Sequence, residues 1–135
     1  PQQQFVSEND NSCVLKIEQG TVLLTSDIEA SAEAWLVETY GADLKAKILI
    51  APHHGSKTSS TFDFIKAVQP DYALISAGYR NQFGHPHPDV LQRYEQIKAK
   101  WLNTADKGAI TLTTKDGSWL IQAMRETESK YWNNQ

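Results

Sequence analysis

All four histidines of the chain stand in two short loops, and one aspartate follows a third apolar stretch. His53 and His54 come after one predicted strand, His85 and His87 come after the next, and Asp27 follows an earlier one. Neutral imidazole and carboxylate groups are standard ligands for Zn²⁺, Mn²⁺ or Fe²⁺. A carboxylate also bridges two such ions about 3.5–4 Å apart, which suits in-line displacement at phosphorus. The pattern is therefore typical of a metal-dependent hydrolytic site.

Each of these groups also has a plain structural interpretation. Residues 52–55, Pro-His-His-Gly, are sufficient for a tight turn, although a turn does not require two adjacent imidazoles. In residues 84–88, Gly-His-Pro-His-Pro, the prolines have an alternative role in setting up the next helix. Asp27 is equally a candidate N-cap for the helix that follows it. The residue types alone leave these alternatives open.

Short apolar runs predict the strands that position the polar groups. Residues 13–18 and 21–25 form a predicted hairpin, and Asp27 lies just past its second strand. Residues 47–51 and 72–76 are apolar runs that predict core strands, and histidines follow each of them. Successive strand ends in an α/β layer gather along one edge of the sheet, where ligands usually bind. The predicted strands therefore bring the polar groups to a common edge.

Two helices are predicted between these strands. Apolar residues at helical spacing predict one helix of about ten residues that includes Ile28 and ends at Gly41. A second helix is capped by Ser59 or Ser60 and ends at Pro70. Because helices and strands alternate through the middle of the chain, the sequence predicts a layered α/β domain with a mixed sheet.

The last third of the sequence predicts one more helix and a hairpin. Pro88 suits the first helical position, and apolar residues at helical spacing continue through Trp101. Residues 109–114 and 118–124 form a predicted hairpin across an Asp-Gly turn. No internal repeat, low-complexity tract or linker divides the chain, so we expect a single domain.

The bulk composition limits the class of protein. The 135 residues fit one compact domain, and 40% hydrophobic with 21% charged residues is typical of a globular chain. The net charge of −3 argues against binding nucleic acid mainly by bulk electrostatics. No run approaches the roughly 18 apolar residues of a membrane span, and the single Cys13 excludes an intramolecular disulfide. Residues 1–11 and 125–135 are polar and expected to be poorly ordered.

Three stretches together resemble signature stretches of the ComEC competence family. They are residues 25–29 (Thr-Ser-Asp-Ile-Glu), 51–59 (Ala-Pro-His-His-Gly-Ser-Lys-Thr-Ser) and 84–88 (Gly-His-Pro-His-Pro). Residues 9–15 and 106–110 resemble the family too, so that the likeness covers roughly residues 9–122. The His-His-Gly stretch by itself indicates only the wider metallo-β-lactamase superfamily.

The resemblance implies a metallo-β-lactamase-type αββα sandwich, of which this chain is the C-terminal portion, with a mixed sheet flanked by helices. It implies two divalent metal ions, Mn or Zn, in the intact domain. The parent domain is then a metal-dependent phosphodiesterase or nuclease that acts on DNA during competence-related uptake across the membrane. The expected partners are single-stranded DNA, the remainder of the same polypeptide with its membrane channel, and a second copy of the chain. The expected location is a soluble domain of an inner-membrane protein that faces outward, toward the periplasm.

The resemblance also implies roles for individual residues. Asp27 looks like the ligand that bridges the two metals. His53 or His54 looks like a ligand to one metal, with His53 slightly favoured. His85 resembles a residue that stabilises charge on the phosphate or protonates the leaving group, and His87 is the second candidate for this role.

Ser56 and Lys57 are candidates for contacts with phosphate oxygens, with a solvated loop as the alternative.

Two features depart from the family pattern. Ser26 stands where the family usually has Gly, which reduces backbone freedom but does not remove the neighbouring ligand. The main metal motif of the superfamily, of the type His-x-His-x-Asp-His, is absent, and it normally lies N-terminal to the stretches present here.

We therefore expect residues 1–135 to form a single partial domain that carries one side of the metal site and is inactive alone. Two alternatives stay open. One is a hydrolase of another phosphodiester, such as a phosphocholine ester, or of a small ester. The other is a degenerate, non-catalytic module of a DNA transporter.

Overall fold

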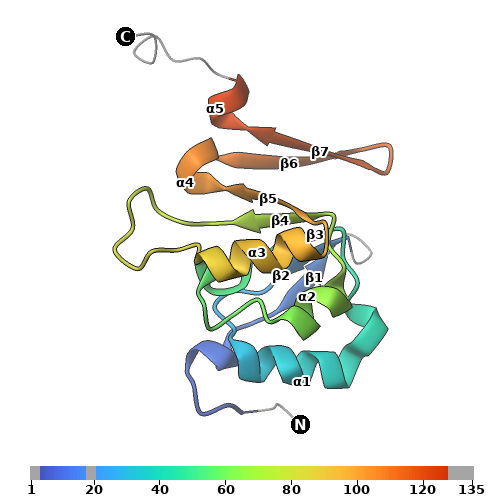
Figure 1. The fold of residues 1–135 in the computed structure, drawn as a ribbon. Helices are drawn as coiled ribbons and strands as arrows, with labels where there is room; N and C mark the ends of the chain where they lie inside the picture. Colours follow the sequence, from blue (N-terminus) through green and yellow to red (C-terminus); the bar gives the residue numbers. More distant parts are fainter. Residues whose placement is uncertain (1–3, 18–20, 128–135) are drawn as a thin grey trace.

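The computed structural model describes residues 4–17 and 21–127. Its central element is a five-stranded mixed sheet (Figure 1). Its strands are β1 (Leu15–Ile17), β2 (Val22–Leu24), β3 (Ile48–Ile50), β4 (Tyr72–Ile75) and β5 (Lys100–Asn103), in that spatial order. β1 is antiparallel to β2, and the other neighbours are parallel. The first four strands confirm the predicted ones.

Three helices cover one face of this sheet (Figure 1). They are α1 (Ala30–Tyr40), α2 (Phe62–Val68) and α3 (Pro88–Gln96). Every second strand residue, including Leu23, Leu49 and Ala73, faces the helices, where these side chains form the main core with Phe64 and Tyr94. The predicted α/β class, a mixed sheet flanked by helices, is thereby confirmed.

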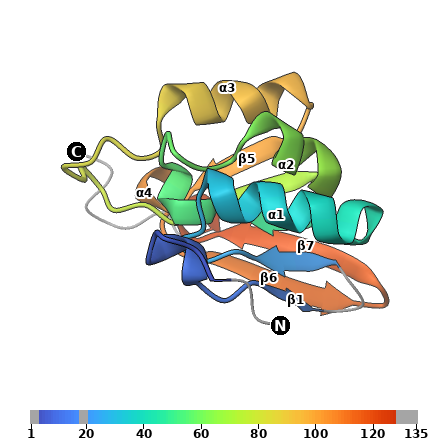
Figure 2. The ribbon, with the colours of Figure 1, turned by 90° about the horizontal axis from the view of Figure 1, so that it is seen from below.

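A two-stranded hairpin packs on the opposite face of the sheet, as Figure 2 shows from below. It consists of β6 (Ile110–Lys115) and β7 (Ser118–Ala123), as predicted. Asp116 and Gly117 between them both have positive φ, at 51° and 75°, which is the geometry of a type I′ turn. The hairpin residues that alternate inward, such as Trp119, pack against Val22, Ile48 and Leu74.

The predicted helix through Trp101 is wrong in its last part. Helix α3 ends at Gln96, and residues 100–103 form β5 beside β4. Lys98 adopts a left-handed conformation with φ of 62° and directs the chain away from the helix. Glycine usually signals such an ending, and a lysine gives no such signal. Trp101 reaches the core under α3 from the strand, so its apolar character suited both interpretations.

Helix α1 is capped by a residue far from it in sequence. Its own N-cap residue, Glu29, makes no side-chain capping bond. Instead, the carboxylate of buried Asp10 accepts hydrogen bonds from the backbone N–H groups of Glu29 (2.6 Å) and Ala32 (3.4 Å). Asp27 therefore does not cap this helix. Within the polar N-terminal stretch, Asn9–Asn11 form the 3₁₀ turn η1 around Asp10.

Helix α2 is capped in the same way, by Glu33 of helix α1. The carboxylate of Glu33 is fully buried and accepts hydrogen bonds from the N–H groups of Ser60 (2.6 Å) and Thr61 (2.8 Å). The predicted caps Ser59 and Ser60 have other partners: Ser59 donates to the carbonyl of Pro52, and Ser60 pairs with the Tyr94 hydroxyl. The prediction of a serine cap is therefore wrong.

Two short helices complete the fold: α4 (Thr104–Lys107) follows β5, and α5 (Met124–Thr127) follows β7. The part of the predicted disordered tail beyond residue 127 lies outside the described residues. Within residues 4–17 and 21–127, no helix has the length and apolar character needed to cross a membrane.

Candidate functional site

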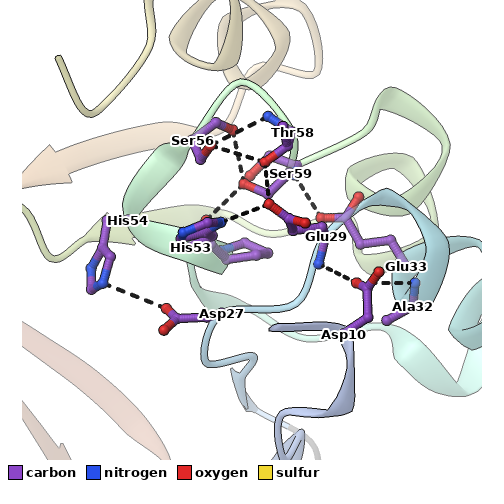
Figure 3. A network of polar contacts seen from close by, with 12 residues as sticks. Asp10, Asp27, Glu29, Ala32, Glu33, His53, His54, Ser56, Thr58 and Ser59 are labelled. Carbon is purple, nitrogen blue, oxygen red and sulfur yellow. Dashed lines mark hydrogen bonds and ion pairs between the residues drawn. The ribbon is translucent and has the colours of Figure 1, made fainter. Parts of the chain in front are cut away.

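The predicted edge site is formed by the loops that follow the parallel strands. Asp27 follows β2, and His53 and His54 follow β3 in the 3₁₀ turn η3 (Pro52–Gly55). Since β2, β3 and β4 are parallel, their C-terminal ends meet at one edge of the sheet. There the Nε2 atom of His54 lies 3.5 Å from Oδ1 of Asp27 (Figure 3). The structure thus brings His54 to Asp27, although the resemblance slightly favours His53.

The orientation of His54 is fixed by its other ring nitrogen. Its Nδ1 lies 2.7 Å from the carbonyl oxygen of Ser76, just after β4. A carbonyl oxygen only accepts hydrogen bonds, so Nδ1 carries the proton and donates it. In the neutral ring, Nε2 is then a lone-pair acceptor that faces a second acceptor, the Asp27 carboxylate. Either a proton on Nε2 or a cation between the two groups is needed to make this contact favourable.

His53 is held by a different carboxylate. Its Nδ1 lies 3.1 Å from Oε1 of Glu29, and the same oxygen accepts a 2.6 Å hydrogen bond from the Thr58 hydroxyl (Figure 3). That hydrogen bond from Thr58, together with the neighbouring His53, lowers the pKa of Glu29. Neither Glu29 nor Thr58 was predicted as a site residue, although both lie in stretches that resemble the ComEC family. Their 29-residue separation hides the contact.

His85 joins this cluster from the loop after β4. Its ring centroid lies 6.0 Å from that of His53, and Phe83 stacks on it at 5.8 Å with an interplanar angle of 20°. Burial, followed by the neighbouring histidines His53, His54 and His87, lowers the pKa of His85. Its buried Nδ1 has no hydrogen-bond partner among the described residues. A buried polar atom of this kind is a candidate for contact with a ligand.

The other predicted site residues have contacts within the chain. His87 is the N-cap of α3, where its Nδ1 accepts a 3.1 Å hydrogen bond from the Asp89 N–H group. Ser56 is buried, and its hydroxyl pairs with that of Thr58 at 3.0 Å. Lys57 is exposed, with Nζ 3.8 Å from the Asp89 carboxylate. The contacts of His87 and Ser56 stabilise the local fold.

The backbone at the site is strained. His53 and His54 both have left-handed conformations, with φ of 46° and 56°, and Gly55 follows with φ of 77°. A left-handed residue other than glycine costs roughly 1–2 kcal/mol, and such strain concentrates at functional sites. A simple turn usually places glycine, asparagine or aspartate at such positions, whereas this turn uses two adjacent imidazoles. The strain therefore favours the functional interpretation of the pair.

Close packing joins the two histidine loops. A Cβ atom added to Gly55 would lie 2.7 Å from Cβ of Pro86. The N–H group of His87 also donates a 2.9 Å hydrogen bond to the Gly55 carbonyl. Only glycine allows this approach, so Gly55 holds His54 and His85 in one cluster.

Replacing Ser26 by Gly is expected to stabilise the chain by about 0.5–1 kcal/mol. Ser26 is exposed and has φ of 50°, so glycine removes roughly 1–2 kcal/mol of strain while its freedom in the unfolded chain takes back about 0.4–1 kcal/mol. Urea unfolding followed by circular dichroism measures the change. The matched control is Ser118→Gly in strand β7, which we expect to lose roughly 0.5–1 kcal/mol. Equal losses in both variants would contradict the strain at Ser26.

Comparison with known proteins places these features in context. No family model matches the chain. It is 37% identical to the uncharacterized protein YcaI of Escherichia coli K12 over 94% of this chain and 17% of the relative. It is 36% identical to competence protein ComA of Neisseria gonorrhoeae over 94% of this chain and 18% of the relative. It is 38% identical to ComE operon protein 3 of Bacillus subtilis over 82% of this chain and 14% of the relative. These matches fit a segment of a ComEC-family protein.

The chain spans about a sixth of the length of the curated relatives it matches. Within the described part of this ComEC-like segment, no group of three or more histidine, cysteine, aspartate or glutamate side chains is placed to hold a metal ion. Asp27 and His54 are a pair of donors, and His53 is turned toward Glu29 instead.

Proposed function

We propose that this chain is part of a metal-dependent phosphodiesterase domain that acts on DNA during competence-related uptake. The names of the relatives, competence protein ComA and ComE operon protein 3, support the process. The cluster of Asp27, His53, His54 and His85 supports the chemistry. We further propose that the fold is the C-terminal portion of a metallo-β-lactamase-type αββα sandwich within a longer polypeptide.

The contact between Asp27 and His54 is the observation that carries this proposal. Two ligands about 2.0–2.2 Å from a common tetrahedral ion are separated by roughly 3.3–3.6 Å, and the two side chains lie 3.5 Å apart. The Nδ1–H bond from His54 to the Ser76 carbonyl directs Nε2 toward the carboxylate. Histidine ligands usually have such a second partner, which fixes the tautomer and the ring orientation.

The residues of the chain have distinct roles in this proposal. Asp27 and His54 hold a Zn²⁺ or Mn²⁺ ion, and Glu29 orients His53 beside them. The ion, when bound, neutralises charge on the phosphate and makes water a better nucleophile. His85 orients a phosphate oxygen from the adjacent loop, and the cap at His87 fixes the start of α3 beside it.

Two donors are not enough for a complete site, so the remaining ligands must come from outside the described residues. Structural and catalytic zinc sites use at least three protein ligands. We therefore expect the 135-residue chain to bind metal weakly and to lack nuclease activity. Robust metal-dependent cleavage of DNA by the purified chain would overturn this expectation.

A calorimetric titration of the chain with Zn²⁺ and Mn²⁺ tests the proposed ligands. We expect Asp27→Ala and His54→Ala each to lower the metal affinity about tenfold or more, because each removes a direct ligand. His53→Ala is expected to have a smaller effect, since His53 is paired with Glu29. The matched control is Asp63→Ala, which removes an exposed carboxylate on α2. An affinity equal to that of the wild type in the Asp27 and His54 variants would rule the pair out as ligands.

A second candidate function is a non-catalytic module of a DNA transporter, since the described residues bring only the pair Asp27 and His54 together as donors. The full-length polypeptide separates the two. Metal-dependent hydrolysis of DNA, lost in Asp27→Ala, supports the phosphodiesterase. Hydrolysis of a chromogenic phosphodiester without hydrolysis of DNA indicates a different substrate, such as a phosphocholine ester.

A further inference from the structure

The loop between β4 and α3, residues 77–87, carries two strongly exposed aromatic side chains. Tyr79 is 68% exposed and Phe83 is 71% exposed. In Figure 1 this loop extends from the edge of the sheet, beyond the helices. Exposed rings of this size do not stabilise a folded chain, because their apolar faces stay in water. Two such rings in one loop beside the histidine cluster are therefore candidates for contact with a ligand.

The loop is ordered by its own hydrogen bonds. The side chain of Asn81 accepts a 2.9 Å bond from the His85 N–H group and donates to the carbonyls of His85 (2.6 Å) and Gly78 (3.1 Å). These bonds close the loop between residues 78 and 85. The aromatic side chains are thus presented by a formed loop, which lowers the entropic cost of binding.

The groups around the two rings are polar and cationic. The Arg80 guanidinium lies 5.2 Å from the centroid of the Tyr79 ring, and the His85 ring stacks on Phe83. Asn81 and Gln82 fill the sequence between them. Aromatic residues and arginine also occur in protein interfaces, but the buried core of such an interface is mostly apolar, and residues 78–85 contain no aliphatic side chain. Flat rings with a cation beside them are the usual features of a platform on which nucleobases stack.

We propose that residues 77–87 form a stacking platform for unpaired nucleobases, with Tyr79 and Phe83 as the stacking rings and Arg80 as a phosphate contact. This inference rests on the proposed function, because a phosphodiester held at His85 carries a base within reach of Phe83. A chain of net charge −3 gains little from bulk electrostatics with nucleic acid, so stacking on the two rings is the contact that would hold the strand. Bases inside a duplex are already stacked on each other, so the platform selects single strands.

Fluorescence anisotropy with a labelled single-stranded oligodeoxynucleotide of roughly ten nucleotides tests the platform, in EDTA so that no metal takes part. Tyr79→Ala and Phe83→Ala are each expected to weaken binding roughly 5- to 150-fold, because stacking contributes about 1–3 kcal/mol per base. The matched controls are Tyr40→Ala and Phe62→Ala, which remove exposed rings at other places, 48% and 41% exposed. We expect these two to bind like the wild type.

Three further strands sharpen the test. An abasic strand of equal length keeps every phosphate and lacks the bases. We expect the wild type and the Phe83→Ala variant to bind this abasic strand equally weakly. A blunt duplex is expected to bind more weakly than the single strand. A ribonucleotide strand of the same sequence separates the two sources of unpaired bases, and tighter binding of either one supports the platform.

Equal binding of the abasic and complete strands, or no binding of any single strand, would overturn the proposal. Circular dichroism checks that each variant is folded, and no change is expected because both rings are exposed. The binding assay contains no metal, so the phosphodiesterase proposal can fail in its own assay while the platform stands. The reverse also holds: cleavage without base-dependent binding would reject the platform alone.

Discussion

Replacing Gly55 by Ala is expected to lower the free energy of unfolding by about 2–5 kcal/mol. Gly55 has φ of +77°, where a residue with a Cβ atom pays roughly 1–2 kcal/mol. The new Cβ would also lie 2.7 Å from Cβ and 3.1 Å from Cα of Pro86, and overpacking of this kind adds typically 1–3 kcal/mol. Urea or thermal unfolding of the chain measures the loss.

Gly84→Ala is the matched control, because Gly84 has φ of +67° but nothing within 4 Å of the added Cβ. It experiences the backbone strain without the contact, so we expect a loss of about 1 kcal/mol. If the two variants lose the same free energy, the packing of Gly55 on Pro86 does not join the histidine loops. A larger loss in Gly55→Ala supports the joined arrangement.

Replacing Glu33 by Ala is expected to lower the free energy of unfolding by about 3–5 kcal/mol, the range for removing one partner of a buried ion pair. Glu33 is fully buried, and its carboxylate holds the N–H groups of Ser60 and Thr61 at the start of α2. Arg93 contributes a favourable charge from α3, where it also donates to the carbonyls of Ser59 and Ser60. Alanine leaves two N–H groups without acceptors. Equilibrium unfolding in urea gives the difference in free energy.

Glu33→Gln is the control for Glu33→Ala, because it keeps the size and one acceptor oxygen, and we expect a smaller loss. The pH dependence of the free energy of unfolding also distinguishes Glu33→Gln from the wild type. Burial raises the pKa of Glu33 above its usual value of 4.5, while the hydrogen bonds from Thr61 and Ser60 act in the opposite direction. A raised pKa in the folded state means that stability is greatest below 4.5 and falls as pH rises through the folded pKa. This fall should be absent in Glu33→Gln; its persistence there would assign it to another group.

Local patterns were enough to predict most of the sheet. Strands β2, β3 and β4 are short apolar runs, and the β6–β7 hairpin has the Asp-Gly turn that its geometry requires. Strand β5 was missed because Trp101 fits both a helical period and a strand. The decisive feature is the left-handed conformation of Lys98, which a lysine does not signal because glycine is the usual residue at such a helix end.

The candidate site was predictable by residue type but not by orientation. Asp27, His53, His54 and His85 were identified from their places after strands, and the structure gathers them at one edge. The position after a strand does not show which of two adjacent histidines faces Asp27. The left-handed backbone of His53 and His54 directs His54 toward it. The acceptor Glu29 was missed because its partners lie 24 and 29 residues away.

The distant caps of α1 and α2 have a consequence for the order in which the chain folds. Asp10 completes the start of α1, and Glu33 of α1 completes the start of α2. Neither helix has a side-chain cap of its own, so each is incomplete until the preceding part of the chain has docked. We therefore expect η1, α1, α2 and the turn η3 to open as one cooperative unit, in which local opening at η1 is transmitted to the histidine turn. Hydrogen exchange in α1, α2 and η3 should accordingly proceed together.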